Sequence, residues 1–392
     1  MFRFIRQPGP RAQLSTRWAL FAVFTAFVAF VVSCGVEKGK TVSPETQRPP
    51  LINGMTYSPD RVLTRQNVGV AVSARDPDGD PMSYVWRASR GTFPGGTSRA
   101  AVTWRSPAGL GIDTLMVTVS DGERAVSDSV LIPVVQIAPP ASLGFVSSTV
   151  LVDLVWEESI DDGPISGWAG YEVYLAENSL AGLSGVELLP FRQPGIVPGL
   201  TKKLDGLRQG TRYYARVGSV REHPGQVFER SEPSDEVNFA PRPQGITQLN
   251  EIGGSSAPTA FDLSERTLRR IQPTDPVAVD QVDFYIGTDD PMDGPGRLML
   301  KSVSLLANRH PAWAARPILI KKIGSDFRIS TTTDDGWLDQ VEIQEETVYA
   351  LKLPEGNYAK VEVPRDAVIG IQPYRRVRLQ WAYQLIPDYP NF

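Results

Sequence analysis

The sequence contains few of the side chains that metal sites and most enzyme active sites require. Its 392 residues include one cysteine and two histidines, His223 and His310. Zinc needs three or four nitrogen or sulfur ligands, and a Ser–His–acid triad needs a histidine beside a nucleophile. Neither histidine lies in a nucleophile-elbow motif, and we find no glycine-rich phosphate loop. The composition therefore predicts a protein that is not an enzyme and that holds no organic cofactor.

The single cysteine, Cys34, ends an N-terminal targeting segment. Four arginines and no acid precede an uncharged apolar run, Trp18 to Val32. Ser33 and Cys34 follow this run. A basic start, an apolar run and a small residue before the cysteine resemble a bacterial lipobox. The resemblance implies a lipoprotein signal peptide over residues 1–33 and a diacylglycerol on the Cys34 thiol. The alternative is an uncleaved membrane anchor, because residues 18–36 are uncharged and near the length of a span.

Both interpretations place the rest of the chain outside the cytoplasm, since the basic segment stays inside. Gly35 follows the cysteine, which in Gram-negative lipoproteins implies sorting to the outer membrane. Removal of residues 1–33 takes away four arginines and no acid, so the net charge changes from −4 to −8. An acidic surface argues against nucleic acid as a partner. We expect a cell-envelope protein, lipid-anchored at the outer membrane of a Gram-negative bacterium.

The remaining chain shows the pattern of an all-β protein. A chain of this length exceeds one ordinary core, and short alternating segments rich in Val, Thr and Tyr are separated by turn signals every eight to twelve residues. Residues 34–50 are polar and rich in proline, which indicates a tether. We therefore expect tandem immunoglobulin-like β-sandwiches followed by a C-terminal β-sandwich domain, over residues 51–137, 138–243 and 244–392.

The first unit contains the stretch "DPDGDPMSYVW" and ends with "TLMVTVSDG". This order resembles the PKD and cadherin-like immunoglobulin repeats of bacterial surface proteins. The resemblance implies that Trp86 is the core tryptophan of a central strand. It also implies that Asp121 and Gly122 turn the last hairpin.

Three alternating aspartates in this unit, Asp76, Asp78 and Asp80, allow two interpretations. An EF-hand loop that starts at Asp76 needs glycine at its sixth position and glutamate at its twelfth, but Pro81 and Arg87 stand there. Aspartate, proline and glycine in this order favour a turn. In the repeats that the unit resembles, such acidic turns sometimes bind calcium with acids from neighbouring loops. A plain turn and a calcium site both remain open.

The second unit resembles a fibronectin type III domain. Leu207 is followed six residues later by Tyr213, and this spacing matches the tyrosine corner, in which the phenol bonds to the backbone of the preceding loop. The resemblance implies that Trp156 lies in the core. The loop Leu175 to Gly199 is long for this fold. It is either an ordinary insertion with a short helical turn or a segment that contacts a neighbouring domain.

The third unit carries strand-like segments that include "TVYALKLP", "NYAKVEVP" and an aromatic-rich "WAYQ". These segments resemble the C-terminal half of HmuY-like lipoprotein domains, which are all-β and capture haem through histidines. Residues 260–268 and the following "VDFYI" resemble the matching first strands. His223 and His310 fall in different units, so a clamp of two histidines within one domain is not available. Haem is therefore a disfavoured cofactor.

Candidate ligand-binding residues of the third unit are His310, Trp313 and Trp337. Both tryptophans stand in loop-like contexts rich in Pro, Asp and Gly, where an exposed ring forms a platform for a sugar or a protein partner. The alternative is that each ring folds back over the sandwich. The acidic pairs at 334–335 and 345–346 are candidates for glycoside hydrolysis, but they resemble hairpin ends.

Taken as a whole, these features predict non-enzymatic binding or adhesion through the C-terminal domain, with the two immunoglobulin-like modules as a spacer. The expected partners are the membrane, through the lipid on Cys34, and an extracellular glycan or protein. Two alternatives remain open. One is capture of haem or another nutrient for an outer-membrane transporter. The other is a purely structural envelope component.

Overall fold

The computed structural model describes residues 47–391, apart from residues 148, 150, 164, 254–256, 272–281, 309–310 and 329–334. The expected signal peptide, Cys34 and His310 lie outside these residues. Regular structure in the described part of the chain consists of β-strands and three short 3-10 helices, and the predicted all-β fold is confirmed. No helix found there has the length and apolarity that a membrane crossing requires.

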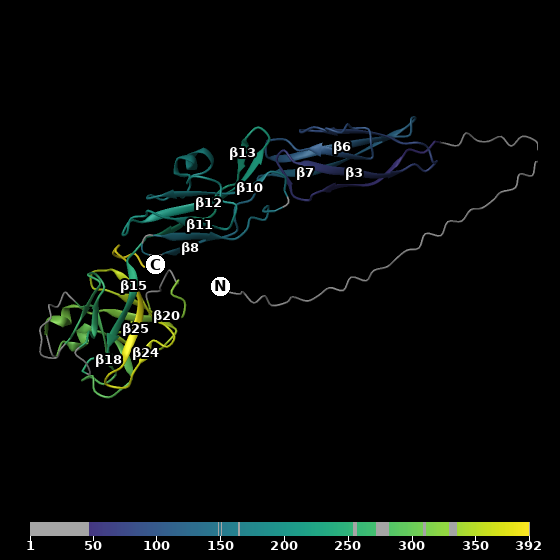
Figure 1. The fold of residues 1–392 in the computed structure, drawn as a ribbon. Helices are drawn as coiled ribbons and strands as arrows, with labels where there is room; N and C mark the ends of the chain where they lie inside the picture. The colour runs from purple at the N-terminus through teal and green to yellow at the C-terminus, as the bar shows by residue number, and fades with distance from the viewer. Residues whose placement is uncertain are drawn as a thin grey trace, which may run out of the picture. The chain divides into compact units, whose positions relative to one another are not determined.

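The described strands form six sheets, two in each of three consecutive stretches of the chain. These stretches cover residues 51–135, 143–239 and 244–383, and they are coloured from purple to yellow in Figure 1. No sheet among the described strands joins two stretches. The chain is therefore built from successive sandwiches, each with its own hydrophobic core.

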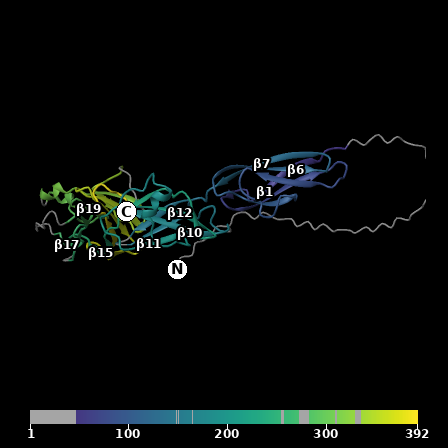
Figure 2. The same cartoon turned by 90° about the horizontal axis from the view of Figure 1, so that it is seen from above.

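The first sandwich pairs a three-stranded sheet with a four-stranded sheet. The first sheet is β1 (Leu51–Ser58), β3 (Asn67–Arg75) and β5 (Ala101–Arg105); the second is β2 (Val62–Leu63), β7 (Ala125–Val135), β6 (Gly111–Ser120) and β4 (Ser83–Ala88). Figures 1 and 2 show β6 and β7 side by side in one layer. Alternate residues of β6 point into the core, as a strand with one buried face requires. Trp86 is buried there, and its indole N–H donates to the carbonyl of Arg99 at 2.8 Å.

The second sandwich pairs a three-stranded sheet with a four-stranded sheet. One sheet is β8 (Leu143–Ser147), β9 (Val152–Trp156) and β11 (Thr201–Leu204); the other is β10 (Trp168–Ala176), β12 (Tyr213–His223), β13 (Val227–Arg230) and β14 (Val237–Phe239). Trp156 and Leu207 lie in the core between them. The Tyr213 hydroxyl accepts a hydrogen bond from the backbone N–H of Arg208 at 3.1 Å, which is the contact that a tyrosine corner makes.

The long loop of this sandwich packs on its own domain. It contains a 3-10 helix, η1 (Gly185–Phe191), whose Leu188 is buried against Leu180 and Tyr174. Arg192, at the end of η1, donates to the buried carboxylate of Glu172 at 2.8 Å. The loop therefore adds a separate hydrophobic cluster to the second sandwich.

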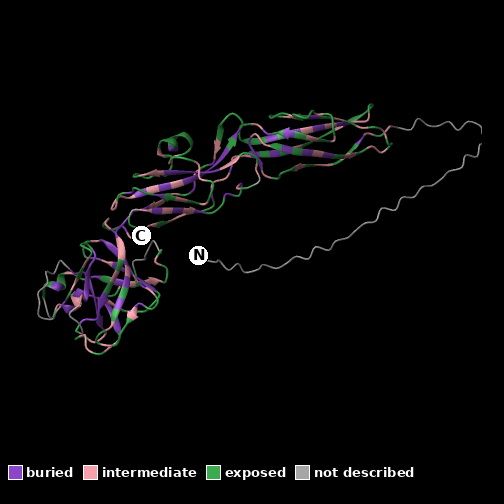
Figure 3. Ribbon diagram, in the orientation of Figure 1, coloured by how far each residue is buried: buried purple, intermediate pink, exposed green. Residues whose placement is uncertain are grey.

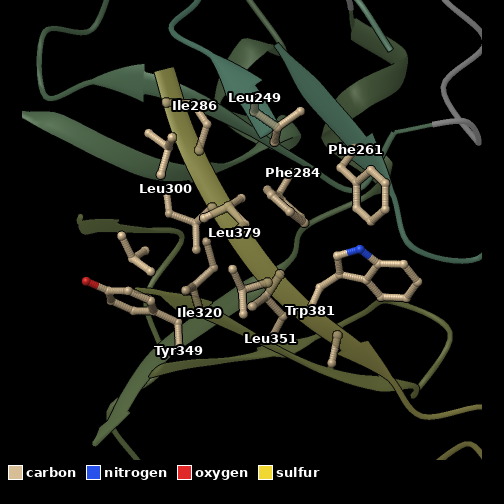
Figure 4. Packing of buried hydrophobic residues seen from close by; sticks show 14 of the residues in the cluster. Leu249, Phe261, Phe284, Ile286, Leu300, Ile320, Tyr349, Leu351, Leu379 and Trp381 are labelled. Carbon is tan, nitrogen blue, oxygen red and sulfur yellow. The ribbon is translucent and has the colours of Figure 1, made fainter. Parts of the chain in front are cut away.

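The third sandwich closes around the largest hydrophobic cluster of the described chain. One sheet is β15 (Gln244–Asn250), β25 (Arg376–Tyr383), β23 (Tyr358–Val363), β22 (Thr347–Lys352) and β20 (Leu319–Gly324), with β24 (Val368–Ile369) beside β25; the other is β17 (Thr267–Arg269), β16 (Ala260–Asp262), β18 (Phe284–Thr288), β19 (Leu298–Ser302) and β21 (Gln340–Glu342). Figure 4 shows side chains of both sheets meeting between them, among them Phe284, Leu300, Leu351 and Trp381. Burial of each such side chain contributes roughly 1.5–3 kcal/mol.

The second of these sheets is covered on both faces. Phe284 and Ile286 of β18 point into the main core, and Tyr285 points the other way into a second cluster. Two 3-10 helices, η3 (Val303–Leu306) and η4 (Pro311–Ala315), contribute Leu306 and Trp313 to that cluster. All residues of β16, β18 and β19 are therefore buried, as the purple strands in Figure 3 show.

Candidate functional site

The acidic turn of the first sandwich is closed by its own backbone. The Asp76 Oδ1 atom accepts the backbone N–H groups of Asp78 and Asp80 at 2.8 and 3.1 Å, and Gly79 has a φ of 87°. These are the contacts of a capped turn. Among the residues that the structure describes, no group of three or more His, Cys, Asp or Glu side chains is placed to hold a metal ion. The calcium interpretation therefore has no ligand set at this turn.

The two candidate tryptophans of the third sandwich have different environments. Trp313 is only 1% exposed, so the prediction that it forms an exposed platform is wrong. The reason is that η4 covers the outer face of the second sheet and turns the indole into the cluster around Tyr285. Trp337 is half-buried. Its ring centroid lies 6.3 Å from that of Tyr358, and the Lys321 Nζ atom lies 6.0 Å from the Trp337 ring centroid.

Trp337 stands within an exposed segment. Asp335 has an 88% exposed side chain and forms an ion pair of 3.1 Å with Lys321, while Leu338 is 57% exposed. An indole, a cation and an exposed leucine thus lie together on the third sandwich. We call Lys321, Asp335, Trp337, Leu338 and Tyr358 the Trp337 surface.

The histidine that the structure describes is hydrogen-bonded to a carboxylate. His223 ends strand β12 and is buried. Its Nε2 atom lies 2.9 Å from Glu229 Oε2 on the neighbouring strand β13. The imidazole is therefore part of the second sandwich, where the carboxylate of Glu229 holds it.

A buried lysine in the third sandwich has a strongly altered environment. Burial and the neighbouring Arg242 guanidinium lower the pKa of Lys360 to about 6. Its Nζ atom donates to the carbonyl of Phe327 and lies 4.7 Å from the centroid of the Phe327 ring. Burial also lowers the pKa of Arg242 to about 10. A neutral amine is a candidate nucleophile, but Lys360 is 1% exposed, so its environment is that of a structural residue.

A buried aspartate in the same sandwich is likewise perturbed. Burial raises the pKa of Asp283 to about 6, and the nearby carboxylate of Asp262 acts in the same direction. One oxygen of Asp283 accepts from Arg316 at 3.1 Å, and the other accepts from the backbone N–H of Leu263 at 2.8 Å. Both carboxylate oxygens thus have structural partners, and the side chain is closed off from solvent.

The first and second sandwiches are joined by side chains that sequence reasoning did not single out. Arg61 forms a two-pronged pair with the buried Asp161, at 2.9 and 3.1 Å. The other Asp161 contact is the backbone N–H of Ala138 in the connecting segment, at 2.7 Å. From the second sandwich, the buried Arg221 donates to the carbonyl of Thr64 at 2.9 Å. Charged side chains of each sandwich therefore form hydrogen bonds with side-chain or backbone groups of the other.

A cavity of about 530 Å³ lies at this junction. Arg61, Arg65 and Arg105 line it from the first sandwich, and Arg221 lines it from the second. Two acidic side chains, Asp161 and Glu222, also contribute to its wall. This is a polar site with an excess of positive charge.

Comparisons with known proteins give only distant likenesses. No protein-family model matches the chain, and no curated protein matches it. A solved two-domain fibronectin type III segment of chicken tenascin is 16% identical and covers 49% of this chain and 99% of its own, with a TM-score of 0.24. The chicken CNTN1 FN1–FN3 domains are 14% identical over 50% of this chain and 67% of their own, with a TM-score of 0.21. At these TM-scores neither likeness bears on function.

Proposed function

We propose that this chain is a non-enzymatic protein of the cell envelope, in which the first two sandwiches act as a spacer for the third. One observation carries the proposal. The junction between the first two sandwiches is closed by the Arg61–Asp161 pair and by the contact from Arg221 to Thr64. A freely jointed linker needs no such contacts, whereas a spacer of defined length requires them.

The anchor of this spacer is proposed to be a lipid on Cys34. The proposal rests on the lipobox-like sequence before the cysteine and on the polar tether behind it, residues 34–50. Several acyl chains on one cysteine give stable membrane attachment, which a single chain does not. The HmuY-like resemblance of the third unit agrees with a surface lipoprotein.

Cys34→Ser is expected to abolish the membrane attachment of the mature protein. Serine has no thiol to form the thioether with diacylglycerol, so the variant carries no acyl chain at this residue. The measurement is membrane fractionation of cells that express the wild-type protein or the variant, with high-salt washing of the membranes. If the variant stays as firmly bound as the wild type, and the wild-type chain isolated from the membranes still carries residues 1–33 by mass, the lipid-anchor proposal is wrong and the uncleaved span takes its place.

Contact with a glycan is proposed for the Trp337 surface. A half-buried indole supported by Tyr358 presents part of its ring, and Lys321 and the exposed Leu338 flank it. Aromatic rings supply rigid contact area for a ligand. The haem alternative finds no support in the described residues, because His223 is engaged by Glu229.

Trp337→Ala is expected to weaken glycan binding about tenfold, since loss of a central aromatic anchor commonly costs more than 1 kcal/mol. The measurement is a glycan array with the full-length protein in detergent, followed by titration of any glycan that binds. Tyr374→Ala is the matched control, because Tyr374 is a 62% exposed ring of the same sandwich that does not belong to the Trp337 surface. Equal binding by wild type and Trp337→Ala would exclude this surface as the glycan site.

A further inference from the structure

The cavity at the junction of the first two sandwiches is lined by residues of both sandwiches. Its volume of about 530 Å³ lies within the range of small-molecule sites. Both sandwiches contribute to its wall, so it exists only when they are in contact. Pro59, Ile160, Ile165 and Pro224 supply apolar wall between the charged groups.

The charges of the wall do not cancel. Four arginines line the cavity, against one aspartate and one glutamate. Without residues 1–33 the chain carries a net charge of −8, so a cationic cavity stands out from an acidic protein. A cavity that concentrates positive charge attracts anions over the rest of the surface.

Two of the four arginines are already used by the protein. Arg61 pairs with Asp161 and also donates to the carbonyl of Gln136 at 2.8 Å. Arg221 donates to the carbonyls of Thr64 and Ser166 at 2.9 and 2.7 Å. These two side chains form part of the wall, and few of their N–H donors remain for a ligand.

The other two arginines, Arg65 and Arg105, have guanidinium N–H donors that can bind a ligand. The guanidinium of neither one makes a hydrogen bond or an ion pair with any residue that the structure describes. Each guanidinium carries five N–H donors in a planar fork that fits a carboxylate or a phosphate. The backbone holds Arg65 at a φ of 50°, a left-handed conformation that is uncommon for a side chain of this size.

We propose that this cavity binds a small anionic ligand of sugar size, with a carboxylate or phosphate held by Arg65 and Arg105. The apolar wall formed by Ile165 and Pro224 accommodates the carbon skeleton of such a ligand. Because both sandwiches line the cavity, the bound ligand also ties them together. The site is separate from the Trp337 surface, and it does not depend on the proposed lipid anchor or on glycan binding there.

The test is isothermal titration calorimetry on the full-length protein in detergent, with three probes. Glucuronate carries a carboxylate, glucose 6-phosphate carries a phosphate, and glucose is the neutral control. We expect saturable binding of at least one anion with a dissociation constant of about 1 mM or lower, and binding of glucose at least tenfold weaker. The anion that binds distinguishes a carboxylated sugar from a phosphorylated one.

The double variant Arg65→Gln with Arg105→Gln is expected to lower the affinity for the bound anion about tenfold to a hundredfold, since hydrogen bonds to charged groups are worth that much. Arg87→Gln is the matched control, because Arg87 is an exposed arginine of the same sandwich outside the cavity. Thermal unfolding verifies that the double variant is folded. The proposal is overturned if neither anion binds saturably, or if the double variant binds as tightly as the wild type.

Discussion

Replacing Lys360 by methionine is expected to stabilise the third sandwich at pH 6 to 7 and to do so much less at pH 10. The side chain is 1% exposed, and burial together with Arg242 lowers its pKa to about 6. In the unfolded chain a lysine titrates near 10.4. Folding therefore requires Lys360 to lose a proton that the unfolded chain binds readily, and this loss lowers the stability of the folded state. Methionine has no proton to lose and fills a similar volume.

The sign of the pH dependence follows from these two pKa values. Between pH 6 and about 10.4 the unfolded state carries one more proton at this side chain than the folded state does. The stability of the wild type then rises with pH by at most about 1.4 kcal/mol per pH unit from this group. The advantage of Lys360→Met is therefore fully present below pH 6 and is lost as the pH rises towards 10. Its size near neutral pH is on the order of 1–4 kcal/mol, as for other buried charges replaced by apolar groups.

The measurement is denaturant unfolding of wild type and Lys360→Met at pH 6, 8 and 10. Lys322→Met is the matched control, since Lys322 is an exposed lysine of the same sandwich whose Nζ atom donates to the exposed side chain of Gln344 at 2.7 Å. A gain in stability that is equal at all three pH values, or a loss at pH 6, would show that Lys360 is charged in the folded protein.

The second prediction concerns the junction of the first two sandwiches. Asp161→Ala is expected to let them separate. Asp161 is buried, and its carboxylate accepts from the Arg61 side chain and from the backbone N–H of Ala138. Removal of the carboxylate takes away the acceptor for both of these donors. Loss of one partner of a fully buried pair costs about 3–5 kcal/mol. The free energy lost in Asp161→Ala is smaller than this, since the Arg61 side chain is 37% exposed.

Asp128→Ala is the matched control for this change. Asp128 is an exposed aspartate of β7, and its carboxylate bonds only to the neighbouring backbone N–H of Ser129 among the contacts of the described chain. We expect the control to leave the junction intact. If the distance between the two sandwiches in solution is distributed in both variants as it is in the wild type, the Arg61–Asp161 pair does not hold the sandwiches together.

Local patterns in the sequence were enough to predict the all-β fold and many of its strands. Short alternating segments predicted the strands in general, and the Leu207 to Tyr213 spacing predicted the side chain that bonds to the Arg208 backbone. Strand β8 is harder to predict, because two prolines stand just before it and its five residues show no clear alternation. Its place in a sheet follows from pairing with β9, which local sequence does not encode.

The candidate sites were harder to predict, because they depend on contacts between distant residues. A proline- and alanine-rich context suggested an exposed loop at Trp313, but the outer face of a distant sheet buries it. The Arg61–Asp161 pair joins residues that are 100 positions apart, and the contact from Arg221 to Thr64 spans 157 positions. No periodicity or motif signals such pairs. The cationic cavity is a consequence of these contacts, and it could not have been found from the sequence.

The most direct test of the spacer is the distance between its two sandwiches in solution. Cys34 is the only cysteine, so Cys34→Ser gives a cysteine-free background in which spin labels can be placed at Ser129→Cys and Lys203→Cys. Both positions are exposed, one on β7 and one on β11. Pulsed electron paramagnetic resonance should then give one narrow distance distribution with the wild-type junction and a broad one with Asp161→Ala. A broad distribution with the wild-type junction would contradict the account, because the two sandwiches would then move independently and could not set a defined length.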